Sequence, residues 1–169
     1  MAWSQEMLPD YWLPQPPMVL SADECRACDA FLADALAQGA SAVSDYTLPI
    51  PKWQFLCYVA TEHDVVLHGS GNGEIACFEP RHPSDHEEFG AQMAIYAAAD
   101  GIWPLYFAII DRIKSPSLVN ACIYLEDAEG TMSQPYYCFS ISQQAMAHQP
   151  YHNGFTSHRT LCIGKVKYG

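Results

Sequence analysis

Hydrophobic residues recur at helical spacing in two segments of the first third of the chain. In the first segment they fall along one helical face, at Cys25, Cys28, Phe31, Leu32, Ala35 and Leu36. The capping box Ser21-Ala-Asp-Glu24 predicts where this helix begins, and Gly39 predicts its end after Gln38. The second segment, residues 52–61, predicts a shorter helix with apolar positions at Trp53, Leu56, Cys57, Val59 and Ala60.

The rest of the chain consists mainly of short apolar runs between turn residues, which is typical of strands. The predicted strands are 64–67, 75–78, 92–97, 120–126, 136–142 and 160–168. A third helix is predicted over 102–113, with Asp100 as its cap and Pro104 in the first turn, where proline is tolerated. Because helices and strands do not alternate regularly, we expect an α+β fold.

The first 20 residues form a proline-rich arm, with Pro9, Pro14, Pro16 and Pro17. Proline removes a backbone donor and fixes φ, so this arm cannot be helical throughout. Trp3, Tyr11 and Trp12 favour an arm that packs on the body of the protein over a free tail.

The 169 residues carry a formal net charge of −11, and all 19 carboxylates precede residue 131. Such a surface repels phosphate backbones, so a nucleic-acid partner is not expected. No apolar run is long enough to span a membrane, and the N-terminus lacks the cationic start and apolar core of a secretory signal. The seven scattered cysteines then indicate reduced thiols and a cytoplasmic protein.

Two groups of residues raise the possibility of a metal site. Cys25 and Cys28 have the spacing of half a zinc site, but both fall on the apolar face of the first helix, which favours core packing. The stretch 82–86 holds two histidines and an aspartate, but Pro83 prevents a helix from aligning them, which favours a polar loop. We expect no bound metal.

Two fragments carry chemistry that suits a dinucleotide. One is a strand that ends in His68-Gly69-Ser70, and the other is a strand that ends in Tyr96-Ala97, with Tyr96 28 residues after His68. Glycine lets the backbone approach a carboxamide closely, and a histidine can hydrogen-bond a ribose hydroxyl. Tyrosine and a second aromatic, such as Phe107, can sandwich a cationic nicotinamide ring. A buried histidine, a turn serine and two core aromatics would give the same pattern.

VVLHGSG at 65–71 and AIYAAAD at 94–100 resemble the first two motifs of the ADP-ribosyltransferase superfamily, in its poly(ADP-ribose)-polymerase-like His-Tyr-Glu branch. The chain also resembles uncharacterised bacterial proteins with an HGS…FEPR…YA pattern, FEPR being residues 78–81. The resemblance implies split antiparallel sheets in an ADP-ribosyltransferase-like domain over 53–169. Residues 1–20 are then the arm, and 21–52 an N-terminal helical extension.

By this resemblance, His68 and Tyr96 are the catalytic candidates, and NAD is the cosubstrate. His68 would bind the nicotinamide ribose, Gly69 the carboxamide, and Tyr96 the ring. Arg81 would reach a phosphate or the adenosine side. The implied cofactor-binding residues are His68, Gly69, Ser70, Arg81, Tyr96, Tyr106, Phe107 and Asn153.

The third motif of that branch, a glutamate near the end of the domain, is not matched. It would fall near Gly154, beside Asn153, and residues 131–169 hold no carboxylate. Glu126 and Glu129 are conceivable substitutes from another strand, but no sequence feature favours them.

Three function hypotheses follow. The first is an enzyme that cleaves the nicotinamide–ribose bond of NAD and transfers ADP-ribose to an unknown protein or small-molecule acceptor. The second is a non-catalytic module with the same fold. The third is a metal-dependent enzyme that uses His63, His82, Asp85 and His86.

Overall fold

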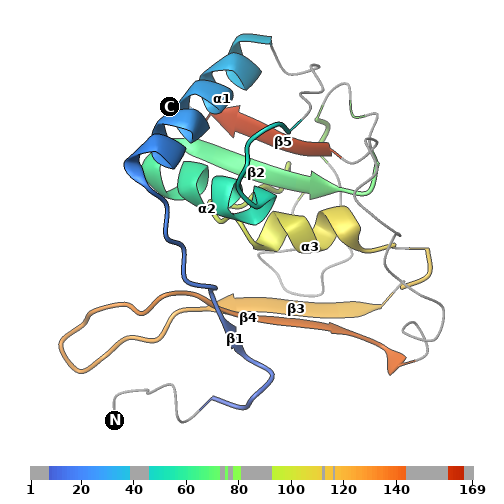
Figure 1. Ribbon diagram of the computed structural model, residues 1–169. Coiled ribbons are helices and arrows are strands. Elements are labelled where there is room, and N and C mark those ends of the chain that lie inside the picture. Colours follow the sequence, from blue (N-terminus) through green and yellow to red (C-terminus); the bar gives the residue numbers. More distant parts are fainter. Residues whose placement is uncertain are drawn as a thin grey trace. The chain divides into compact units, whose positions relative to one another are not determined.

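A computed structural model describes eight stretches of the chain (Figure 1). They are residues 8–38, 46–72, 75, 78–80, 93–111, 113–115, 117–143 and 160–165. The helices are α1 (Ala22–Gln38), α2 (Lys52–Glu62) and α3 (Trp103–Ile109). The strands are β1 (Leu13–Pro14), β2 (Val65–Ser70), β3 (Leu118–Ile123), β4 (Tyr136–Ile141) and β5 (Thr160–Lys165). Among these described helices, none has the length and apolar character needed to cross a membrane.

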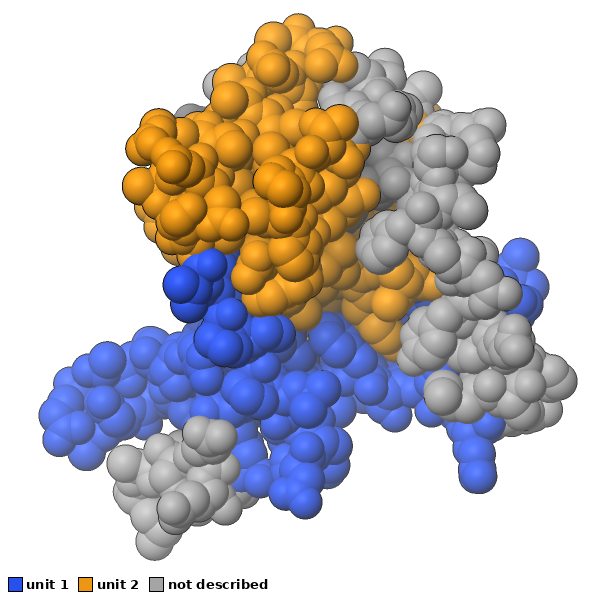
Figure 2. All heavy atoms as spheres, in the orientation of Figure 1, with its two compact units in different colours: residues 1–19, 110–153 blue, residues 20–109, 154–169 orange. Residues whose placement is uncertain are grey.

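The chain divides into two units, which Figure 2 shows in different colours. The first unit comprises residues 1–19 and 110–153, and the second comprises 20–109 and 154–169. The first contains a three-stranded sheet in the order β1-β4-β3, and the second contains the pair β2-β5. Every ladder is antiparallel. Helices together with antiparallel sheets give the α+β class expected from the sequence.

In the second unit, α1 begins and ends where its capping box and apolar periodicity predict. The Ser21 N–H donates to Glu24 Oε2 at 2.7 Å, and the Glu24 N–H donates to Ser21 Oγ at 3.3 Å. The predicted apolar face packs against α2 and β2. The buried core residues of this cluster are Cys28, Leu32, Ile50, Phe55, Leu56, Val59, Val65 and Leu67. The expected helical extension therefore shares one core with the strand that carries His68.

The cysteines of α1 are free thiols that contribute to packing. Cys28 is fully buried and belongs to the core cluster, which confirms the prediction made from its position on the apolar face. Burial raises the pKa of the Cys28 thiol. Cys25 is half-buried, and Cys57 on α2 is a second buried cysteine that forms no disulfide.

Several predicted elements differ from those observed. The strand predicted over 120–126 is observed as β3, which begins at Leu118 and ends at Ile123. β2 extends to Ser70, because all six of its residues pair with β5 (Figure 1). The strand predicted over 92–97 does not form in its described part, residues 93–97. Isolated bridges stand at Ala94 and at Ala98 instead, and Ala98 pairs with Leu67. The helix expected to reach Ile113 ends at Ile109.

The early end of α3 has a local cause at Asp111. Its carboxylate Oδ1 accepts hydrogen bonds from the backbone N–H groups of Ile113 and Lys114, at 3.0 and 3.3 Å. A side chain that satisfies these donors competes with the helical hydrogen bonds. Asp100 caps the other end as predicted, because its Oδ1 accepts from Ile102 and Trp103.

The first unit is a hairpin with the arm added at its edge. The β3–β4 connection contains the predicted turn, in which Gly130 has φ of 83° and its N–H donates to the Asp127 carbonyl at 3.2 Å. Leu13 and Pro14 of β1 pair with Tyr137 and Tyr136 of β4. An edge strand tolerates proline, which is why Pro14 can take part in this ladder. The pairing confirms that residues 13–14 of the arm lie against β4, whereas Tyr11 is exposed and Trp3 lies outside the described residues.

Candidate functional site

The candidate site is built on one face of β2. Successive side chains of a strand point to opposite faces, and the burial of β2 follows this alternation. Val65 and Leu67 are buried, whereas His68 is half-buried. His68 and Ser70 are two residues apart and therefore lie on the same face, opposite that of Leu67.

A second segment, residues 93–98, runs beside this strand. Leu67 and Ala98 exchange both of their backbone hydrogen bonds, each 2.8 Å long. Nδ1 of His68 lies 2.7 Å from the carbonyl oxygen of Tyr96. The two fragments singled out in the sequence therefore meet, through the imidazole of one and the main chain of the other.

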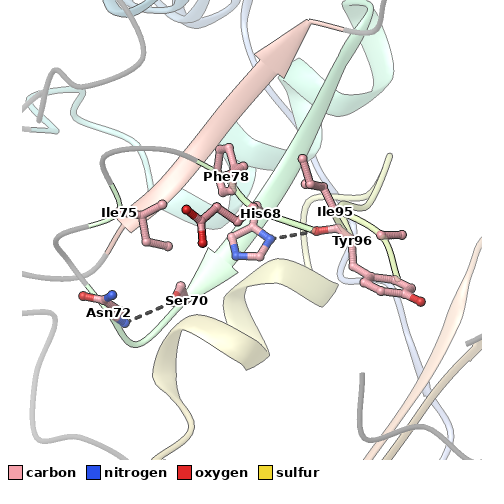
Figure 3. A pocket seen from close by; sticks show the side chains of 9 residues that line it. His68, Ser70, Asn72, Ile75, Phe78, Ile95 and Tyr96 are labelled. Atoms are coloured by element: carbon pink, nitrogen blue, oxygen red, sulfur yellow. Dashed lines mark hydrogen bonds between the residues drawn. The ribbon is translucent and has the colours of Figure 1, made fainter. Parts of the chain in front are cut away.

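This contact fixes the tautomer of His68. A carbonyl oxygen only accepts hydrogen bonds, so Nδ1 must carry the proton, and in the neutral ring Nε2 is an acceptor. The Phe78 ring packs edge-on against the imidazole, with centroids 5.0 Å apart and an interplanar angle of 70°. In Figure 3, Nε2 is on the side of the ring away from Tyr96, facing toward Ser70.

A cavity of about 110 Å³ opens beside the imidazole (Figure 3). Its polar lining comes from His68, Ser70, Asn72 and Glu79. Its apolar lining includes Ile75, Phe78, Ala94 and Ile95. Ser70 Oγ accepts a hydrogen bond of 3.1 Å from the Asn72 N–H, which shapes the turn at the end of β2. The cavity is thus lined by one hydrogen-bonded imidazole together with a few polar and apolar side chains.

Gly69 occupies a position where no side chain fits. A Cβ added there would lie 1.7 Å from the carbonyl oxygen of Pro104, in the first turn of α3. The packing of α3 on β2 therefore requires glycine. The backbone N–H and C=O of Leu67 both point toward Ala98. Because backbone groups two residues apart in a strand point to the same edge, the N–H and C=O of Gly69 point to the edge where Ala98 lies.

Two of the three aromatic residues expected at the site, Tyr106 and Phe107, are not among the described residues that line the cavity. Tyr106 is only 6% exposed and packs edge-on against Phe107, with centroids 5.5 Å apart. Tyr96 does line it, but Figure 3 shows its ring pointing away from Ser70 and Phe78. Tyr96 contributes its carbonyl group to the contact with the imidazole.

Several expected site residues lie outside the described part of the chain. They are Arg81 and Asn153, and the possible metal ligands His82, Asp85 and His86. Within the described residues, no group of three or more histidine, cysteine, aspartate or glutamate side chains is placed to hold a metal ion.

Phe78 and Glu79 line the cavity, although no motif in the sequence predicts a role for them there. Phe78 ends the strand predicted over 75–78 and Glu79 begins a polar stretch, so the sequence does not predict that both reach the cavity beside His68. The sequence signal for them is their place in the Phe-Glu-Pro-Arg stretch, which contributes to the resemblance alone.

A separate polar cluster joins α1 to the end of α2. Asp29 Oδ1 accepts hydrogen bonds from His63 Nε2 at 2.9 Å and from the Tyr58 hydroxyl at 3.0 Å. The bonds from His63 and then Tyr58 lower the pKa of the Asp29 carboxyl. Desolvation and the bond to Asp29 raise the pKa of Tyr58 to about 12. His63 thus bonds to a carboxylate of α1 and is not among the described residues that line the cavity.

Comparisons of this chain with protein-family models, with curated proteins and with solved structures found no match.

Proposed function

We propose that this protein binds NAD at the cavity beside His68, cleaves the nicotinamide–ribose bond and transfers ADP-ribose to a protein or small-molecule acceptor. The observation that carries the proposal is the 2.7 Å contact between His68 Nδ1 and the Tyr96 carbonyl oxygen. It joins the two motifs on which the resemblance to ADP-ribosyltransferases rests, although 28 residues separate them.

The fixed tautomer of His68 supports a contact with ribose. Nε2, left without a proton in the neutral ring, would accept a hydrogen bond from a hydroxyl of the nicotinamide ribose. The N–H and C=O of Gly69 would take the carboxamide, because they point to the edge of β2 where residues 93–98 run. Phe78 would offer a ring to the cationic pyridinium.

The size of the cavity indicates which part of NAD it would enclose. Its 110 Å³ is well below the roughly 300–1,000 Å³ of pockets that hold drug-sized ligands. The cavity would therefore take the nicotinamide end, with the remaining dinucleotide extending beyond it. The antiparallel pairs of both units are compatible with the split sheets of an ADP-ribosyltransferase-like fold, which is part of this proposal.

The absence of acidic residues from 131–169 favours the second candidate, a non-catalytic module that binds the nucleotide without cleaving it. Both candidates share the cavity and differ only in chemistry. They are therefore separated by asking first whether NAD binds, and then whether nicotinamide is released.

The test is calorimetric titration of NAD into the wild-type chain, His68→Ala and His63→Ala, followed by a nicotinamide-release assay. Loss of one ribose hydrogen bond, worth about 1 kcal/mol, should weaken binding by His68→Ala about fivefold. His63→Ala removes an imidazole outside the cavity and should bind like the wild type. Binding with release supports the enzyme, and binding without release supports the module. Absence of NAD binding to the wild-type chain would overturn both.

A further inference from the structure

The sequence leaves the proposed reaction without its expected carboxylate. As the nicotinamide–ribose bond breaks, positive charge develops on the ribose C1′ and its ring oxygen. Negative charge preorganised beside that centre is the usual way for an enzyme to stabilise such a transition state. The final 39 residues, where the third motif would lie, contain neither aspartate nor glutamate.

Glu79 brings a carboxylate to the cavity from a different part of the chain. It lies eleven residues after His68, beyond the glycine-rich stretch, and lines the same cavity as His68 and Ser70. Of the described lining residues, Glu79 alone carries a carboxylate. Its neighbour Phe78 packs edge-on against the imidazole at 5.0 Å, so this part of the chain is anchored at the site.

We propose that Glu79 is the catalytic carboxylate of this protein and takes the place of the missing third-motif glutamate. The inference rests on the proposed function, since it assigns a role within the same reaction. It differs from the family pattern, because the carboxylate comes from the segment after β2 instead of a strand near the end of the domain.

The step balances with NAD and a hydroxyl acceptor alone. The C1′–N bond breaks, and its electron pair neutralises the pyridinium nitrogen, so nicotinamide leaves uncharged. The acceptor oxygen forms the new bond to C1′ and loses its proton to solvent. Glu79 would accept a hydrogen bond from a ribose hydroxyl and stabilise the positive charge at C1′, while His68 holds the ribose in place. No oxidant, reductant or metal is consumed.

Glu126 and Glu129 provide matched controls. Both lie in the connection between β3 and β4, where Glu126 forms a bridge with Met132 and Glu129 donates its N–H to Asp127 Oδ1. Neither is among the described residues that line the cavity. Replacing either residue by glutamine removes one negative charge outside the cavity. Glu79→Gln removes the same charge from the lining of the cavity.

The experiment measures NAD affinity by calorimetry and nicotinamide release for the wild-type chain, Glu79→Gln, Glu79→Asp and Glu126→Gln. Glu79 is exposed, so the near-isosteric Gln variant should unfold at the wild-type temperature. We expect Glu79→Gln to bind NAD within about threefold of wild type and to release nicotinamide about 100- to 1,000-fold more slowly. Glu79→Asp keeps the charge but shortens the side chain, so its rate of nicotinamide release should lie between those of the wild type and Glu79→Gln. Glu126→Gln should release nicotinamide at the wild-type rate.

The outcomes separate the two proposals. If the wild type releases nicotinamide and Glu79→Gln releases it at the same rate, the proposed role of Glu79 is overturned and the proposed transferase activity stands. NAD binding without release by the wild type would select the non-catalytic module and overturn the role of Glu79. Failure of the wild-type chain to bind NAD would overturn both.

Discussion

Gly69→Ala is expected to destabilise the second unit because two backbones meet at this position. The new Cβ would lie 1.7 Å from the Pro104 carbonyl oxygen, whereas real Cβ atoms essentially never approach closer than 3.0 Å. The first turn of α3 must therefore retreat by about 1.3 Å, or β2 must leave its ladder with β5. Overpacking of this kind costs about 1–3 kcal/mol.

The unfolded state offsets part of this cost. Alanine restricts the unfolded chain more than glycine does, which returns about 0.4–1 kcal/mol. The clash involves backbone atoms that cannot rotate away, so we take the upper end of the range and expect a net loss of about 2 kcal/mol. For a chain of this length, that corresponds to a fall in Tm of about 4–8 °C.

The assay is urea and thermal unfolding followed by circular dichroism, with Ser70→Ala as the control in the same strand. Ser70 lies on the other face of β2, so its replacement leaves the contact with α3 intact. A Gly69→Ala protein that unfolds within 0.5 kcal/mol of Ser70→Ala, on the order of ordinary surface variation, would refute the close packing of β2 and α3.

Two further predictions concern the helices. The lowered pKa of Asp29 stabilises the folded protein above the carboxyl's unfolded pKa of about 3.9, and this contribution is lost as pH falls through the folded value. Asp29→Asn should therefore lose less stability than the wild type as the pH falls, measured by urea unfolding at several acid pH values. The same loss of stability in the wild type and in Asp29→Asn would contradict the bonds from His63 and Tyr58. Ser21→Ala removes the N-cap of α1 and should cost about 1 kcal/mol in urea unfolding, and an unchanged midpoint would contradict the capping geometry with Glu24.

The elements predicted well are those whose signals are local. The capping box and one-sided apolar spacing define α1 within its own residues, and Asp127 with Gly130 defines the hairpin turn. The end of α3 was predicted wrongly because the apolar pattern continues past Ile109, whereas the Asp111 side chain competes for the backbone donors.

The candidate site was predicted in part. The approach of His68 to Tyr96 follows from two strand-like motifs, but sequence alone does not tell whether a ring or a carbonyl makes the contact. That choice depends on tertiary pairing, such as the bridge between Leu67 and Ala98, which sequence alone does not reveal. Glu79 was missed for a related reason, since its place in the cavity depends on tertiary packing beyond the glycine-rich stretch.

The pairing of β2 with β5 has a kinetic consequence. Ser70 and Thr160 are 90 positions apart along the chain, whereas Ile123 and Tyr136, at the near end of the hairpin, are 13 apart. Contacts between distant positions form slowly, because a large loop must close before any pairing energy is gained. On dilution from denaturant, we therefore expect the β3–β4 hairpin to form first and β2 to pair with β5 later. Refolding measured separately at the β3–β4 hairpin and at the β2–β5 pair should therefore show a faster rate for the hairpin.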